Sequence, residues 1–139
     1  MIVLDASFLV KLVLEEEGSR EARNLAKHWI RQNEILSTLD IALAEALNAI
    51  WKHASRIRDL DEAKAVGSMK DLIRIWMLLE VHSSATVAED AFRLALETGL
   101  TVYDSLYIEL ARSMGAKLAT FDTRQAKAAI ARGVMTLPG

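Results

Sequence analysis

Four acidic side chains stand at positions where exposure to water is a poor explanation for them. Asp5 directly follows the apolar run "MIVL", and Asp122 directly follows "KLATF". Glu45 lies in the otherwise apolar stretch "ALAEALNAI", and Asp104 follows "LTVY". An acid at the start of a helix is usually a cap, which suits Asp104 and Asp122 taken one at a time. The four together are candidates for one shared site.

Four carboxylates in one small pocket repel each other, so protons or cations must neutralise them. Ligand sets made only of oxygen favour hard ions, Mg²⁺ or Mn²⁺, over zinc. The chain has no cysteine, which excludes thiolate ligands. Two such ions about 4 Å apart would polarise a phosphodiester and generate hydroxide from bound water. The acids therefore predict metal-assisted phosphodiester hydrolysis, provided that the fold brings them together.

Three smaller polar residues are candidates to support the acids: Ser7, Asn48 and Thr120. Ser7 lies two positions after Asp5, and Thr120 lies two positions before Asp122, so each shares a strand face or a turn with its acid. Capping and strand propensity are alternative explanations for both. Asn48 stands three positions after Glu45, which places the two on one face of a helix.

The elements that must position these residues alternate along the chain. Short apolar runs predict strands at residues 2–5, 34–38, 78–83, 117–121 and 134–137. Amphipathic segments between them predict helices, and the capping-box pairs Ser37 with Asp40 and Thr86 with Glu89 predict where two of them begin. Strands separated by helices imply a parallel sheet that is covered on both faces.

Sites in such sheets form beyond the carboxyl ends of the strands, where the strand order reverses. If the order reverses at the first strand, the first and fourth strands are neighbours and bring Asp5 next to Asp122. The helices that follow the second and third strands could then place Glu45 and Asp104 near Asp5 and Asp122.

The totals favour one α/β domain over residues 1–139, with 52% hydrophobic and 26% charged residues. The formal net charge of −2 means that a nucleic-acid partner must meet a local basic patch. No apolar run approaches the ~18 uncharged residues of a membrane span, and no secretory leader is visible. The absence of cysteine is compatible with a reducing cytoplasm, so we expect a cytoplasmic protein.

Four segments, "IVLDAS", "IALAEALNAI", "LTVYDSLYIELA" and "KLATFD", resemble the motifs of PIN-domain proteins, specifically of VapC-type toxins of toxin–antitoxin pairs. The resemblance runs nearly end to end. It implies a single PIN-like domain with a central parallel sheet of about five strands and helices on both faces. It also implies a metal-dependent endoribonuclease whose acidic quartet falls on Asp5, Glu45, Asp104 and Asp122, with Ser7, Asn48 and Thr120 in support.

The same resemblance implies an RNA substrate, a cognate antitoxin that silences the enzyme, and a homodimer formed through helices near the middle of the chain. Trp51, Met69 and Trp76 are candidates for that surface, although such residues at helical spacing are more often core. Basic residues that flank the acidic motifs could guide RNA to the site: Lys11, Lys52, Arg56, Arg58, Arg124 and Lys127.

Three other functions suit these residues less well. A phosphoreceiver domain requires a pair of acids after its first strand and an Asp after its third, and this chain has only Asp5 and "LLEVHSS" there. A haloacid-dehalogenase-type phosphatase requires Asp-x-Asp where this chain has Asp5-Ala6-Ser7. A PIN-like fold that binds RNA or protein without catalysis would be favoured by a missing carboxylate, and none is missing.

Overall fold

β1 (Ile2–Leu4) is the central strand of a five-stranded sheet in the computed structural model, which describes residues 1–139. The strand order is β3-β2-β1-β4-β5, and every neighbouring pair is parallel. The other strands are β2 (Leu36–Leu39), β3 (Glu80–His82), β4 (Lys117–Ala119) and β5 (Thr136–Leu137). The order reverses at β1, which confirms the predicted neighbourhood of the first and fourth strands.

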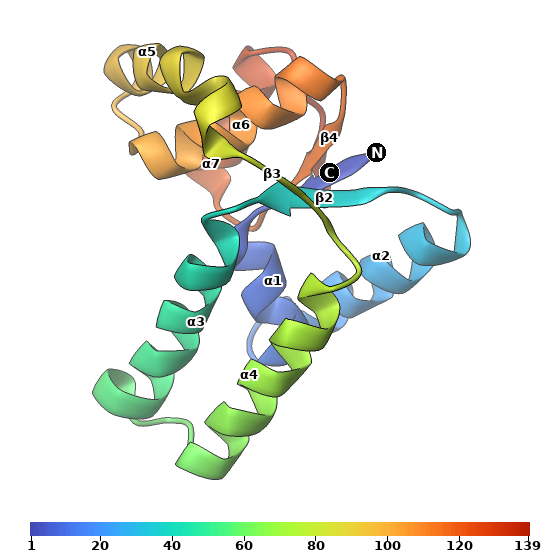
Figure 1. Cartoon of the computed structure of the whole chain (residues 1–139), viewed down its shortest axis with the longest axis vertical. Helices are drawn as coiled ribbons and strands as arrows, with labels where there is room; N and C mark the ends of the chain where they lie inside the picture. Colours follow the sequence, from blue (N-terminus) through green and yellow to red (C-terminus); the bar gives the residue numbers. More distant parts are fainter.

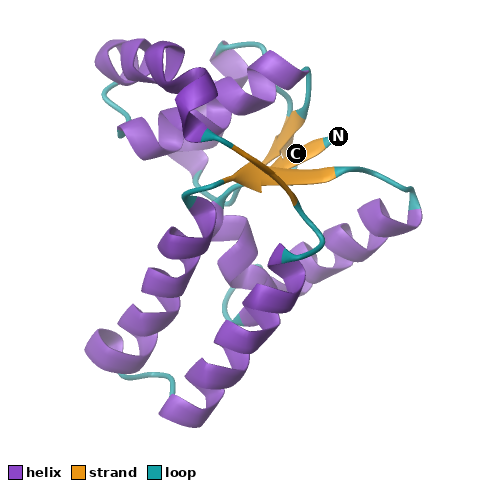
Figure 2. Ribbon diagram, viewed as in Figure 1, coloured by secondary structure: helices purple, strands orange, loops and turns teal.

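Helices cover both faces of the sheet (Figures 1 and 2). They are α1 (Ala6–Val13), α2 (Ser19–Arg31), α3 (Ala42–Lys52), α4 (Glu62–Trp76), α5 (Ala88–Thr98), α6 (Val102–Met114) and α7 (Thr123–Ala131). A π-helical turn, η1 (His53–Ile57), extends α3, and a 3-10 turn, η2 (Ser84–Val87), precedes α5.

In Figure 1, α1 to α4 lie below the sheet and α5 to α7 above it. The handedness of the crossovers explains this division. The chain moves outward from β1 to β2 and β3, then returns across the sheet to β4 and β5. Because parallel crossovers are right-handed, the two directions of travel place their helices on opposite faces.

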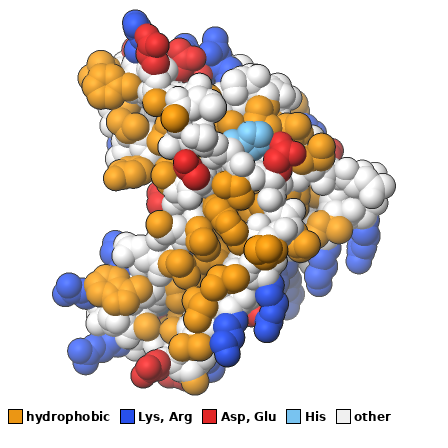
Figure 3. Space-filling model, in the orientation of Figure 1, with side chains coloured by type: hydrophobic (Ala, Val, Ile, Leu, Met, Phe, Trp, Pro, Cys, Tyr) orange, Lys and Arg blue, Asp and Glu red, His pale blue; other side chains and the backbone are white.

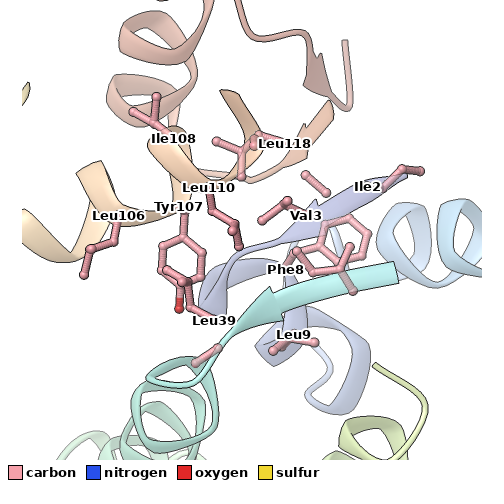
Figure 4. Packing of buried hydrophobic residues seen from close by; sticks show 14 of the residues in the cluster. Ile2, Val3, Phe8, Leu9, Leu39, Leu106, Tyr107, Ile108, Leu110 and Leu118 are labelled. Atoms are coloured by element: carbon pink, nitrogen blue, oxygen red, sulfur yellow. The ribbon is translucent and has the colours of Figure 1, made fainter. Parts of the chain in front are cut away.

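The apolar residues of β1 are fully buried, as their uninterrupted hydrophobic run predicts. Figure 4 shows Phe8 of α1 on one side of this strand and Tyr107 and Leu110 of α6 on the other. Phe8 also stacks on Trp29 of α2, with ring centroids 5.3 Å apart, and on Phe121, 5.6 Å away. Since Phe121 precedes Asp122, this aromatic stack fixes the turn that carries one of the four acids.

The predicted capping-box pairs do not form. Ser37 lies inside β2, where its hydroxyl is buried without a hydrogen-bond partner, and α3 begins only at Ala42. Thr86 lies within η2, and α5 begins at Ala88. At Ser37 the chain pairs as a strand, and at Thr86 it forms a 3-10 turn. In both places the α-helix therefore begins later than the local pattern predicted.

The core interpretation is wrong for Trp51, which is 47% exposed on α3. Met69 and Trp76 on α4 are half-buried. No helix of this structure combines the length and the apolar character needed to cross a membrane.

Candidate active site

Asp5 and Asp122 lie beyond the carboxyl ends of the adjacent strands β1 and β4. Asp5 is the N-cap of α1, and Asp122 is the N-cap of α7. The N–H of Asp5 donates to the carbonyl of Ala119 at 3.2 Å, which ties the end of β1 to the end of β4. Strand order and local capping together therefore place both carboxylates at one edge of the sheet.

The Asp5 side chain is almost completely buried and rigidly held. Its Oδ1 accepts hydrogen bonds from Ser7 Oγ at 2.7 Å and from the Phe8 N–H at 2.8 Å. Burial raises the pKa of Asp5 from 3.8 to about 6, although the hydrogen bonds from Ser7 and from the Phe8 N–H act in the opposite direction. The negative charge of Asp104 raises this pKa further.

Glu45 reaches the site from the first turn of α3, where it accepts a 2.7 Å hydrogen bond from the hydroxyl of Tyr107. Burial, and then the charge of Asp104, raise the pKa of Glu45, while the Tyr107 hydroxyl lowers it. Burial and the Glu45 charge also raise the pKa of Tyr107, so its hydroxyl remains a donor. Tyr107 thus connects α6 to α3 through a proposed ligand.

Asp104 lies in the first turn of α6, which Thr101 caps by accepting the Asp104 N–H at 3.1 Å. Burial raises the pKa of Asp104, and the charge of Asp122 raises it further. Asp104 therefore interacts repulsively with Asp5, Glu45 and Asp122. The fold brings all four acids into one electrostatic neighbourhood.

No basic side chain neutralises this neighbourhood by direct contact. Every ion pair with a nitrogen–oxygen distance of 4.0 Å or less involves other acids. A cluster of partly buried carboxylates without a counter-ion is costly unless protons or cations enter it.

The residues present fit a hard divalent cation by their chemistry. The four donors are carboxylates, with no sulfur or imidazole among them, and such sets favour Mg²⁺ or Mn²⁺. In this structure no three Asp, Glu or His side chains are arranged closely enough to hold a metal ion together. The fit therefore rests on the donor types and on the unbalanced charge.

Two of the three predicted supporting residues contact the acids. Ser7 donates to Asp5, and its oxygen accepts from the Phe121 N–H at 3.3 Å. Thr120 Oγ1 accepts from the Asp122 N–H at 3.0 Å. Asn48 is exposed and its side chain makes no hydrogen bond in this structure, so its supporting role remains a prediction.

The predicted basic residues are spread over the surface. The ammonium group of Lys11 is already bonded to Glu16 Oε1 at 3.1 Å and to the backbone carbonyl of Glu17. Arg124 lies close enough to Asp104 to lower the pKa of that acid, and Lys127 is exposed one turn further along α7. The remaining three, Lys52, Arg56 and Arg58, are exposed at the outer end of α3 and in or after η1.

Tyr107 and Gln125 are residues of the site that were not predicted from the sequence. Tyr107 is buried in the core, yet its hydroxyl binds Glu45. Gln125 is fully buried, and its side chain contacts both Thr120 and the backbone of Asp104. The available signals were the three-residue spacings from Asp104 to Tyr107 and from Asp122 to Gln125, which place each pair on one side of a helix.

The fold and the acidic edge of its sheet define an α/β domain of the PIN class, and the PIN domain model matches residues 2–131. The chain belongs to the PIN domain family.

Among its relatives, Ribonuclease VapC3 of Pyrobaculum aerophilum is 41% identical over 126 residues, covering 91% of this chain and 92% of the relative. The crystal structure of PAE2754 from the same organism superposes with a TM-score of 0.72 at 28% identity, covering 99% of this chain and 83% of that one. A toxin–antitoxin complex from Klebsiella pneumoniae shares the fold, with a TM-score of 0.66 at 16% identity, covering 91% of this chain and 90% of that one.

Proposed function

We propose that this chain is a metal-dependent endoribonuclease that hydrolyses RNA phosphodiester bonds, and that it acts in the cytoplasm as the toxin of a toxin–antitoxin module. Asp5, Glu45, Asp104 and Asp122 hold Mg²⁺ or Mn²⁺. The observation that carries the proposal is the group of four neighbouring carboxylates, with raised pKa values at three of them and no basic partner at any. The similarity to Ribonuclease VapC3 supports the choice of RNA as substrate.

The residues of the chain have separate tasks in this reaction. Asp5 is a fixed ligand, because Ser7 and the Phe8 N–H hold one of its oxygens. Tyr107 orients Glu45 through its hydroxyl. Arg124, close to Asp104, and Lys127, one turn further along α7, are exposed and bind the phosphates of the RNA backbone. A bound Mg²⁺ or Mn²⁺ supplies charge stabilisation and lowers the pKa of its water.

The test is cleavage of structured RNAs by the purified protein with Mg²⁺ or Mn²⁺, and again with EDTA. Wild type should cleave only with metal, and Asp5→Asn should be inactive. Asp71→Asn, which removes an exposed carboxylate on α4, is the matched control and should cleave like wild type. Cleavage by Asp5→Asn at the wild-type rate would assign the activity to another site. Metal-independent RNA binding by wild type without cleavage would favour the non-catalytic alternative.

An apolar groove supports the antitoxin as a partner. It has a volume of about 790 Å³ and lies between α2 and the end of α4, with Ile30, Ile35 and Leu78 exposed along it. Figure 3 shows apolar side chains gathered across the middle of this face. Its lining carries both signs of charge, from Arg23 and Lys27 and from Glu34 and Glu80, so an amphipathic segment that inserts its apolar side is complementary to it.

Co-expression with the product of an adjacent reading frame should yield a complex that does not cleave RNA. Ile30→Glu should weaken that complex, while Met135→Glu, which alters an equally exposed apolar residue outside the groove, should leave it intact. Equal loss of binding with both variants would exclude this groove as the docking surface.

A second set of exposed apolar residues supports the proposed homodimer, at a place other than the predicted Trp51, Met69 and Trp76. Phe92 and Leu96 on α5 and Tyr103 on α6 are 55%, 73% and 59% exposed, and Tyr103 precedes Asp104. Pairing through this surface would bring two acidic sites close to one groove. Sedimentation of the wild-type protein should give a dimer, and Leu96→Glu should give a monomer. A monomeric wild type at micromolar concentration would contradict the dimer.

A further inference from the structure

Gln125 is a fully buried amide whose two ends are both used at the acidic site. Its Nε2 donates to the backbone carbonyl of Asp104 at 3.1 Å, and its Oε1 accepts from Thr120 Oγ1 at 2.7 Å. Its own backbone N–H donates to Asp122 Oδ1 at 3.0 Å. One residue of α7 therefore contacts the start of α6, the turn after β4 and the cap of α7.

The direction of this amide is determined by its partners. The carbonyl of Asp104 can only accept a hydrogen bond, so the NH₂ end of Gln125 must face it. The oxygen end then faces Thr120, whose single hydroxyl proton it accepts. Thr120 is left with a lone pair that accepts the Asp122 N–H.

These contacts act against a repulsion that the site itself creates. Asp104 lies in the first turn of α6 and Asp122 caps α7, so the two carboxylates of like charge belong to different helices. Arg124 of α7 makes the other direct hydrogen bond at this end of the two helices, from its Nη2 to the carbonyl of Gly99, which precedes α6. Its length is 3.3 Å, against 3.1 Å for the bond from Gln125 to Asp104. Without the Gln125 amide, fewer contacts would oppose the separation of the two like charges.

We propose that Gln125 is a positioning residue that holds Asp104 and Asp122 at the separation at which they share a divalent cation, by tying the start of α6 to the start of α7. This rests on the proposed function, in which both acids are ligands. Gln125 touches neither the metal nor the RNA; it acts through the two acids and through Thr120.

The test compares Gln125→Met, which keeps the length of the side chain and removes both hydrogen bonds, with wild type. Gln32→Met at an exposed position is the matched control. Mn²⁺ binding is measured by calorimetry without RNA, and RNA cleavage is measured over a series of Mn²⁺ concentrations. We expect at least tenfold weaker Mn²⁺ binding and a kcat lowered at least tenfold, with KM for RNA within twofold of wild type. Gln32→Met should match wild type in every measurement.

Thermal unfolding in EDTA separates positioning from stability. A Gln125→Met protein that is folded at 25 °C but binds Mn²⁺ and cleaves like wild type would overturn the proposal. If Gln125→Met does not fold, Gln125→Asn, which keeps an amide too short to reach both partners, is measured in the same way. Unfolding of both variants at 25 °C would assign Gln125 a purely structural role and also overturn the proposal. Failure of wild type to bind Mn²⁺ would instead refute the proposed function.

Discussion

Asp5→Asn should make the metal-free protein more stable, and the gain should grow with pH. Asn keeps an oxygen that can accept the hydrogen bonds from Ser7 and from the Phe8 N–H, so the cap of α1 is retained. The substitution removes a buried negative charge that has no basic partner within 4.0 Å. The variant therefore avoids the free-energy cost of burying the Asp5 carboxylate.

The pKa of Asp5 sets the size and the sign of the effect. Its value rises from 3.8 in the free side chain to about 6 in the folded protein. The folded state therefore binds the proton more tightly than the unfolded state, and this contribution to stability is complete below pH 3.8 and lost as pH rises through 6. A difference of about two pH units corresponds to roughly 3 kcal/mol at about 1.4 kcal/mol for each. Roughly 1.4 kcal/mol of it falls between pH 5 and pH 8.

The assay is urea unfolding of both proteins in EDTA at several pH values from 5 to 8. EDTA is required because a bound cation would neutralise the carboxylate and hide its cost. The free energy of unfolding of Asp5→Asn minus that of wild type should increase by roughly 1.4 kcal/mol over this interval. Subtracting the two proteins at each pH removes the titration of the shared groups that lie far from Asp5.

Asp71→Asn is the control, because its side chain is exposed and its pairing with Arg74 lies on the surface of α4. Its difference from wild type should stay within about 0.5 kcal/mol throughout. A constant difference between Asp5→Asn and wild type from pH 5 to pH 8 would refute the idea that burial penalises the Asp5 charge. A difference that becomes smaller as pH rises would mean that the folded protein stabilises the Asp5 charge.

Three further predictions follow from the same contacts. Millimolar Mg²⁺ or Mn²⁺ should raise the thermal midpoint of wild type by relieving carboxylate repulsion, and should raise that of Asp5→Asn less; no shift in wild type would count against a metal-binding quartet. Tyr107→Phe should reduce cleavage and cost about 1 kcal/mol in urea unfolding, because Glu45 loses its hydroxyl partner; unchanged cleavage would exclude an orienting role. Gly18→Ala should destabilise by about 1–3 kcal/mol in the same assay, because φ is +89° and the added Cβ would lie 3.0 Å from the ring of Phe121; wild-type stability would disprove this steric account.

Much of the fold was predictable because its signals are local or topological. The apolar run before Asp5 identifies a buried strand, and the strand–helix alternation implies a parallel sheet with right-handed crossovers. The helix starts were less predictable. Ser37 carries a local capping signal, but the pairing of β2 with β1 and β3 places it inside a strand. Likewise Trp51 has helical spacing that suits a core, and only the packing of α3 shows that it is exposed.

The sequence by itself determined which chemistry this protein has available. Four acids at the ends of strands and the starts of helices, with no cysteine, offer oxygen donors of the kind that a hard cation prefers, because residue type alone sets donor chemistry. Only the tertiary structure decided which side chains hold those acids in place. Tyr107 meets Glu45 across 62 positions of sequence, and Gln125 meets the Asp104 carbonyl across 21. Such contacts depend on how α3, α6 and α7 pack around the sheet, and no local pattern encodes that packing.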